Sequence, residues 1–374
     1  MLFDVAIVGA GIAGASIASE LAPFMSVILI EMEDRPGYHS TGRSAAFWSE
    51  TYGGPMVQPL TTASGAFLAR PDRSFSEKSF LAERGALYLG QSVDAPAIAA
   101  FVDAFSDSDL ALDVLDAETL TKRWPKLMPA WDRGVWDGKC ADIDVAALHA
   151  AYLAKAGRHG AVVACRDTVE HMSYANGLWW IQCSGSDYRA SRVVNAAGAW
   201  VDHIAKLADV SPIGITPYRR TISRVRVDGD VPADLPLVLD INGSFYFKPD
   251  TGGRIWLSPH DETPTIACDV APEELDIAIA IDRFEKVMDW PVLAVEHSWA
   301  GLRSFAPDRL PVFGPDPGNP QFFWSAGQGG FGIQTAPAIA KLLASQILGQ
   351  APDEMVGAID PTFYAPGRFA VPAI

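Results

Sequence analysis

The chain has 374 residues, of which 49% are hydrophobic and 20% charged, and its formal net charge is −16 at pH 7. This acidic balance argues against a nucleic-acid partner, because phosphate binding needs clustered Lys and Arg, and against electrostatic docking to an anionic membrane. The four cysteines, Cys140, Cys165, Cys183 and Cys268, are too few for a disulfide framework and have no zinc-ligand spacing, so we expect reduced thiols, no metal site and a cytoplasmic protein.

The N-terminal segment has the pattern of a dinucleotide-binding βαβ unit. Residues 3–8 predict a buried strand, the glycines of residues 9–14 (GAGIAG) a tight turn, and residues 27–30 a second buried strand that ends at Glu31. The glycines allow the turn, the approach of a pyrophosphate and the packing of a helix that runs to about Leu21. The carboxylate is spaced to bond ribose hydroxyls. An ordinary glycine-rich turn is the alternative. The apolar stretch over residues 5–19 is too short to span a bilayer, so we expect no integral membrane segment.

The rest of the chain mixes helices with hairpins. We predict, in chain order, a strand over 86–89, a helix over 145–156 with Asp144 as its N-cap, a strand over 161–169, a hairpin that turns at Asn176-Gly177 with its return strand over 178–183, two further turns at Asn242-Gly243 and 250–253, and a helix over 333–348. Residues 245–248 alternate as in an antiparallel sheet that buries one face.

Five segments spread over the whole chain resemble the D-amino acid oxidase-like family of flavoenzymes. They are the N-terminal glycine turn, Ser40–Ala46 (STGRSAA), Val193–Gly198 (VVNAAG), Trp299–Arg303 (WAGLR) and Gly327–Gly332 (GQGGFG). Three longer strings are similar to the D-arginine and D-amino acid dehydrogenases of this family: 37–46, 244–250 and 332–335.

The resemblance implies an α/β fold of two lobes, a Rossmann-like FAD-binding domain with an inserted antiparallel-sheet substrate domain. Because the nucleotide-binding segments lie at the start, middle and end, we expect a discontinuous FAD-binding domain over 1–82, 143–212 and 296–374. The substrate-binding domain takes 83–142 and 213–295. No cysteine lies in the last hundred residues, so we expect non-covalent FAD.

The resemblance also implies which segments contact FAD, largely through backbone groups. The expected cofactor-binding residues are Gly9, Ala10, Gly11, Ile12, Ala13, Gly14, Glu31, Met32, Ser40, Thr41, Arg43, Ser44, Ala45, Ala46, Val169, Ala196, Ala197, Gly198, Gly301, Arg303, Gly329, Gly330, Phe331, Gly332, Ile333, Gln334 and Thr335. The glycine turn before the last helix would direct a positive helix end at the flavin, where reduced flavin carries negative charge.

Arg303 is the first candidate for the substrate site, because an arginine in an apolar run needs an anion and its planar fork suits a carboxylate. A structural ion pair with Asp308 is the alternative. Tyr246 could donate a second bond to the carboxylate, or be a core tyrosine. Arg219 and Arg220 point to opposite faces of a strand, and the resemblance favours Arg220 for the site.

Three further residues complete the predicted site. Tyr52 would form a wall or lid over the substrate, and the carbonyl of Gly330 would accept a bond from the substrate amine. Phe47 stands where the D-arginine dehydrogenases have a histidine, and Ala86 where they have a glutamate, although Glu83 is close in sequence. A missing carboxylate leaves a cationic side chain unpaired, so we expect a neutral or hydrophobic side chain in the substrate.

The expected reaction is FAD-dependent oxidative deamination of a D-amino acid: hydride passes from Cα to flavin N5, and the imino acid hydrolyses to a 2-oxo acid and ammonia. The electron acceptor is left open between a quinone, a carrier and O2, and so is peripheral association with a membrane. One alternative is a glycine- or sarcosine-type amine oxidase that uses O2. A second alternative is a non-catalytic FAD-binding protein.

Overall fold

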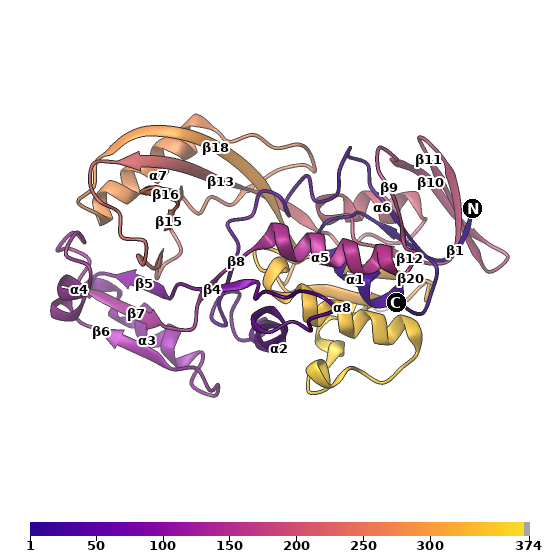
Figure 1. Cartoon of the computed structure of the whole chain (residues 1–374), viewed down its shortest axis with the longest axis horizontal. Helices are drawn as coiled ribbons and strands as arrows, with labels where there is room; N and C mark the ends of the chain where they lie inside the picture. Colours follow the sequence, from indigo (N-terminus) through magenta and orange to yellow (C-terminus); the bar gives the residue numbers. More distant parts are fainter. Residues whose placement is uncertain (370–374) are drawn as a thin grey trace, which may run out of the picture.

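The computed structural model describes residues 1–369, which form two lobes joined by two long strands (Figure 1). One lobe is built on an eight-stranded sheet and the other on a nine-stranded sheet, and a three-stranded sheet lies near the middle of the molecule. The expected α/β fold with two lobes is confirmed. Residues 370–374 of the expected 296–374 segment lie outside the described residues.

The eight-stranded sheet contains the N-terminal unit. Its strand order is β10-β11-β12-β1-β2-β9, and β20 and β19 continue from β12. The strands are β1 (Leu2–Val8), β2 (Val27–Ile30), β9 (Val162–Ala164), β10 (Val169–Ala175), β11 (Leu178–Cys183), β12 (Asp187–Asn195), β19 (Val312–Pro315) and β20 (Phe322–Ala326). Since β1 runs parallel to β2 and β12, and β12 parallel to β20, the carboxyl ends of these four strands meet at one edge, where such sheets bind ligands.

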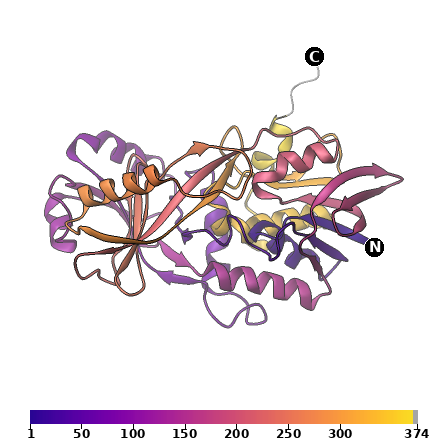
Figure 2. The same cartoon turned by 90° about the horizontal axis from the view of Figure 1, so that it is seen from above.

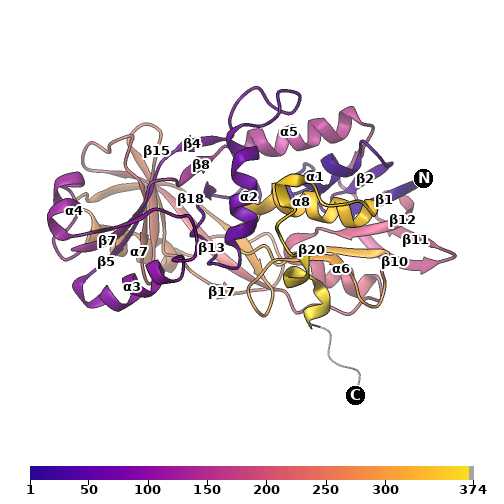
Figure 3. The same cartoon turned by 90° about the horizontal axis from the view of Figure 1, so that it is seen from below.

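Helices cover both faces of this sheet. One face packs on α1 (Ile12–Leu21), α5 (Val145–Arg158) and α8 (Gly332–Leu348), and the other on the short α6 (Val201–Leu207). Strand β1 contributes to the hydrophobic core on each face of the sheet: Val5 and Ile7 face α1, α5 and α8, whereas Ala6 and Val8 face α6. Next to α8 lies α2 (Gln58–Ala69), as Figure 3 shows. Within residues 1–369, no helix is both long and apolar enough to cross a membrane.

The nine-stranded sheet has the order β17-β13-β16-β15-β14-β5-β7-β6, and β18 pairs with β13. Its strands are β5 (Ala86–Gly90), β6 (Leu112–Leu115), β7 (Arg133–Asp137), β13 (Thr216–Val227), β14 (Leu237–Asp240), β15 (Tyr246–Asp250), β16 (Arg254–Ser258), β17 (Thr263–Pro264) and β18 (Val292–Phe305). All its pairs are antiparallel except β5 with β14. The helices of this lobe are α3 (Ala95–Asp103), α4 (Ala117–Arg123) and α7 (Glu274–Val287).

The remaining elements are short. The three-stranded sheet consists of β3 (Phe47–Trp48), β8 (Ala141–Ile143) and β4 (Leu81–Glu83). Five single turns of 3-10 helix are η1 (Ser92–Asp94), η2 (Gly198–Trp200), η3 (Glu354–Val356), η4 (Pro361–Tyr364) and η5 (Pro366–Phe369).

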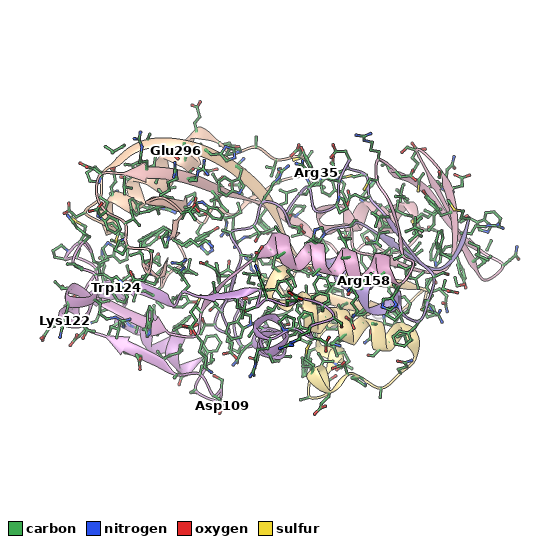
Figure 4. All side chains as sticks on the ribbon, viewed as in Figure 1. Arg35, Asp109, Lys122, Trp124, Arg158 and Glu296 are labelled. Atoms are coloured by element: carbon green, nitrogen blue, oxygen red, sulfur yellow. The ribbon has the colours of Figure 1, made fainter. Side chains whose placement is uncertain are left out.

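Strands β13 and β18 form the longest pairing of the molecule among the described residues, from Thr216 opposite Phe305 to Val227 opposite Val292. Figure 2 shows this pair running from the far side of the second lobe to the junction with the first. At its outer part Glu296 lies at the surface of the second lobe (Figure 4) and pairs with Arg254. Its inner end, which carries Arg303, lies at the junction with the first lobe.

Two expectations about strands are wrong. Residues 161–169 are not one strand: β9 ends at Ala164 and β10 begins at Val169, because the chain turns at Arg166, whose φ is +57°. Residues 245–248 alternate as expected, but both faces are buried: Phe247 packs on Phe284 of α7, and Tyr246 packs in a second cluster with Phe47. The helix over 145–156 is confirmed, and the side chain of its N-cap, Asp144, accepts a bond from the backbone N–H of Ala147.

Candidate functional site

A cavity of about 390 Å³ opens at the carboxyl edge of the parallel strands and continues to the inner ends of β13 and β18. Gly9, Gly11 and Glu31 line it at the N-terminal unit, and Arg220 and Arg303 line it at the second lobe. The cavity therefore connects the predicted dinucleotide site with the predicted substrate site.

The glycine turn fits a dinucleotide because side chains are excluded from it. Gly9 has a φ of +100°, and an added Cβ would stand 2.6 Å from the carbonyl oxygen of Ala196. An added Cβ on Gly14 would stand 1.9 Å from the carbonyl oxygen of Gly9. Helix α1 thus begins at the cavity wall, and its first N–H group, on Ile12, donates to the Thr41 hydroxyl at 2.9 Å. The positive end of the α1 dipole faces the place where phosphates would lie.

Glu31 follows β2 at the same edge and is 8% exposed. Its Oε2 accepts from the backbone N–H of Ala10 at 2.9 Å, and its Oε1 accepts from the backbone N–H of Glu33 at 3.0 Å. These bonds fix the carboxylate beside the glycine turn, and each oxygen keeps a lone pair for a ribose hydroxyl. The residues present therefore fit the adenosine half of FAD.

Segment 37–46 forms the next part of the wall and is tied to the second lobe. The Ser40 hydroxyl donates to the Leu302 carbonyl at 2.7 Å. The Arg43 guanidinium donates to the carbonyls of Val270 and Ala300 and forms an ion pair with Asp269. The Arg43 bond lowers the pKa of the Asp269 carboxyl from its ordinary value. The Arg43 side chain therefore ties segment 37–46 to the second lobe, and we call this set of bonds the clasp.

Replacing Asp269 with asparagine is expected to speed the release of FAD by about 1.4- to 5-fold, since an exposed ion pair contributes roughly 0.2–1 kcal/mol. The neutral amide keeps the shape but loses the charge that holds Arg43, so segment 37–46 opens more often. Stopped-flow release of FAD into apoprotein acceptor measures the rate. Asp289→Asn, which removes an exposed pair with Lys126, is the matched control. Equal release rates in the two variants would contradict the clasp.

At the other end of the cavity, Arg303 meets a tyrosine and the C-terminal glycine turn. Its Nη1 donates to the Tyr52 hydroxyl, and its guanidinium lies 5.9 Å from the centre of the Tyr52 ring and 6.0 Å from that of Tyr246. Tyr246 is 2% exposed and its hydroxyl has no bonding partner. Gly330 lies directly against Arg303, since an added Cβ would stand 2.6 Å from Nη1. No ion pair joins Arg303 to Asp308, which instead pairs with Arg368.

Strand β13 separates the two adjacent arginines. Arg220 lies opposite Gly301 in the β13–β18 register and lines the cavity. Arg219 points to the other face, where its guanidinium pairs with Glu273 and Asp276 of the α7 segment. The alternation of strand side chains therefore gives Arg220, rather than Arg219, to the site.

Arg220 is 3% exposed and only partly satisfied. Its Nε donates to the Asp261 carbonyl at 2.8 Å, whereas its Nη1 is buried with no partner. Burial, together with the nearby Arg303 cation, lowers the pKa of Arg220 from its ordinary value. Burial and the same two cations lower the pKa of His260 to about 3, so this histidine is neutral at pH 7. Arg220 also pairs with Asp261 and Glu262. Within the described residues no carboxylate pairs with Arg303, so Arg303 gives this end of the cavity its positive charge.

The side chains packed beside these donors are apolar, although the predicted site residues Phe47, Tyr52 and Tyr246 do not themselves line the cavity. Phe47 stacks edge-on against Tyr52, with ring centres 4.8 Å apart, and belongs to a buried cluster that contains Ala86 and Tyr246. Glu83 is exposed on β4 and does not line the cavity. A carboxylate to pair with a cationic substrate group is therefore lacking at this position.

Most of the predicted cofactor residues line the cavity. Those that do not are Ala10, Gly14, Ala46, Phe331, Gln334 and Thr335. Their side chains pack behind the wall: Phe331 lies on Phe305 at 6.2 Å, and the Thr335 hydroxyl donates to the Phe331 carbonyl.

Several lining residues escaped the sequence analysis, among them His39, Asp167, Trp200 and His203. His39 forms a 2.8 Å contact with Glu33 and lies 4.6 Å from the Trp200 ring. Their positions in the sequence could have indicated them, since Trp200 and His203 come within five residues of the end of the Val193–Gly198 motif and His39 precedes Ser40. An isolated histidine belongs to no motif, so its residue type alone does not predict that it lines a binding site.

The parallel strands, the side-chain-free glycine turn and the fixed carboxylate define a dinucleotide-binding protein of the Rossmann type. The family model described as "FAD dependent oxidoreductase" (DAO) matches residues 4–346, and the chain belongs to this family. FAD is accordingly its cofactor.

The relatives agree with this assignment. The chain is 26% identical over 278 residues to mitochondrial dimethylglycine dehydrogenase of Mus musculus, a match that covers 67% of this chain and 31% of that protein. It is 25% identical over 264 residues to monomeric sarcosine oxidase of Bacillus sp. (strain B-0618), with 67% and 66% covered. The chain thus matches less than a third of the dimethylglycine dehydrogenase.

The fold is shared with the glycine oxidase of Geobacillus kaustophilus, with a TM-score of 0.86 at 22% identity over 98% of this chain and 99% of that chain. The expected similarity to the D-arginine dehydrogenases stays a prediction.

Proposed function

We propose that the protein oxidises the carbon–nitrogen bond of an amino acid whose carboxylate is held by Arg303. The observation that carries this proposal is the meeting of donors at one end of the FAD cavity. Arg303 and Tyr52 are joined by a hydrogen bond, and the buried Tyr246 hydroxyl and Arg220 Nη1 have no partner. Among the described lining residues, only Glu31 and Asp167 carry carboxylates, and both lie on the β2 and β10 side. A carboxylate ligand supplies the missing acceptor.

The chain's own residues would orient the substrate rather than supply a strong base. The carboxylate fixed by Arg303 restricts the rotation of Cα, and positioning of this kind accounts for much of an enzymatic rate. Gly330, next to Arg303, lies where its carbonyl would receive the amine. Bound FAD supplies the acceptor for the two electrons and the hydrogen taken from the substrate. The resulting imine takes up water and yields a 2-oxo acid and an amine or ammonia.

The substrate class that we favour is a D-amino acid with a neutral or hydrophobic side chain. The buried apolar cluster that contains Phe47 and packs against Tyr52 supports this choice, and a cationic side chain would stay unpaired there. A second candidate is an N-substituted glycine, because relatives named for sarcosine and dimethylglycine match two thirds of the chain. The two candidates share the carboxylate and differ in the group on nitrogen and on Cα.

The deciding experiment mixes the purified holoprotein anaerobically with D- and L-amino acids, glycine, sarcosine and dimethylglycine. It follows the absorption band that flavins in general show at about 450 nm. We expect bleaching by apolar D-amino acids and none by their L-forms. Bleaching by sarcosine or dimethylglycine alone would favour the second candidate. A flavin that no member of the panel bleaches would overturn the proposal and favour a binding protein. Admitting air afterwards separates an oxidase, whose colour returns at once, from a dehydrogenase that needs a quinone or carrier.

A further inference from the structure

The side chain of Gln334 turns away from the cavity although its helix begins at the cavity wall. Its neighbours Gly332 and Ile333 line the cavity, whereas Gln334 is 1% exposed and belongs to the first turn of α8. A buried carboxamide must be fully hydrogen-bonded to be tolerated. Its partners therefore indicate what it holds in place.

Two of the three partners of Gln334 lie in the loop that carries Tyr52, and the third lies on α2. Gln334 Oε1 accepts from the backbone N–H of Ser49 at 3.0 Å, and Nε2 donates to the Tyr52 carbonyl at 3.1 Å. Nε2 also donates to the Thr61 hydroxyl on α2 at 3.0 Å. One acceptor and two donors are thus matched to three groups, and only an amide offers this combination at this length.

The segment held in this way, residues 49–54, is an irregular loop whose Ser49 and Thr51 side chains also bond Asp137 and Tyr88 of the second lobe. Two turn bonds close it, from Tyr52 N–H to the Ser49 carbonyl at 3.2 Å and from Gly54 N–H to the Thr51 carbonyl at 3.4 Å. Gly53 and Gly54 follow with φ values of +104° and +83°, which are open to glycine and costly for other residues. Without a bond at the Tyr52 carbonyl, the loop could shift and carry the tyrosine hydroxyl away from Arg303.

We propose that Gln334 is a positioning residue that holds Tyr52 against Arg303 and thereby sets the affinity of the carboxylate site. The inference rests on the proposed function, because it assigns Gln334 to the same site. Helix α8 thus has two tasks at its first turn: its backbone faces the cofactor, and its Gln334 side chain places the substrate-binding tyrosine.

The test is the binding of pyruvate, a carboxylate without an amine to oxidise, followed through the change that it causes in the flavin spectrum of the holoprotein. We expect Gln334→Met to retain FAD and to raise the Kd for pyruvate about tenfold, the loss of roughly one buried hydrogen bond. Tyr52→Phe should raise the Kd as well. If Gln334 acts through Tyr52, Gln334→Met should cause no further rise when Tyr52 is already phenylalanine.

Gln346→Met is the matched control, because Gln346 lies near the other end of α8 and its Oε1 has no partner; its Kd should equal that of the unaltered protein. A Gln334→Met protein with an unchanged Kd, or with a Kd effect that adds fully to Tyr52→Phe, would overturn the inference. If Gln334→Met does not fold, Gln334→Glu keeps the shape and removes the two donors. If even the unaltered protein binds no carboxylate, the proposed function fails first and the inference falls with it.

Discussion

Replacing Arg303 with methionine is expected to lower kcat/KM for the amino acid substrate by about 30- to 5000-fold, which corresponds to roughly 2–5 kcal/mol. Methionine keeps most of the volume of the side chain but removes the positive charge and the N–H donors of the guanidinium group. The bound carboxylate would then face the Tyr52 and Tyr246 hydroxyls without a cation next to it. Steady-state kinetics and the Kd for pyruvate should change together, because the loss occurs in binding the carboxylate.

Two variants separate this effect from general damage. Arg303→Lys keeps the charge and should recover part of the affinity, although not the two-pronged geometry. Arg219→Met removes an arginine of the same sheet that pairs with Glu273 and Asp276 on the opposite face, and we expect its effect on kcat/KM to be small. A loss in Arg219→Met as large as in Arg303→Met would count against the carboxylate assignment.

Replacing Gly9 with alanine is expected to give a colourless protein that does not retain FAD. The backbone at Gly9 has a φ of +100°, and the new Cβ would stand 2.6 Å from the Ala196 carbonyl oxygen, so the turn has to open. The opened turn moves the N-terminus of α1 and the Ala10 N–H bond that fixes Glu31. The ratio of absorbance at 450 and 280 nm after gel filtration measures the flavin content, where roughly full occupancy is expected of the unaltered protein.

Gly160→Ala serves as the control for this experiment. Gly160 has a φ of +86° and no atom within 4 Å of an added Cβ, so the variant carries the backbone strain without the collision. We expect a loss of stability of roughly 1 kcal/mol and full retention of FAD. If Gly9→Ala also retained FAD, the close approach of this turn to the cofactor would be wrong.

The parts of the site that the sequence predicts are those encoded by short-range pattern. The spacing from Gly9 to Glu31 encodes a turn, a helix and a strand in one continuous segment, so the cradle follows from local chemistry. Strand alternation likewise predicts that Arg219 and Arg220 face opposite sides of the sheet, whereas the choice of Arg220 for the site depends on the family resemblance.

The remaining features depend on pairing between distant segments. Tyr52 and Arg303 are separated by 251 positions, and Gln334 meets Tyr52 across 282. The pattern of apolar and polar residues does not predict which distant segments come into contact. The motif therefore predicts that Gln334 binds the cofactor, whereas its side chain bonds the Tyr52 loop. Likewise, the break at Arg166 follows from a positive φ at a residue type that gives no turn signal, and the strand over 161–169 was therefore expected to continue.

The long β13–β18 pairing also limits how the molecule can move. From Thr216–Phe305 to Arg224–His297 the pairing is uninterrupted, and its register shifts only at the outer end, beyond Arg224. Bending the uninterrupted part would break backbone hydrogen bonds in series. A clam-like opening of the lobes about this ladder is therefore disfavoured.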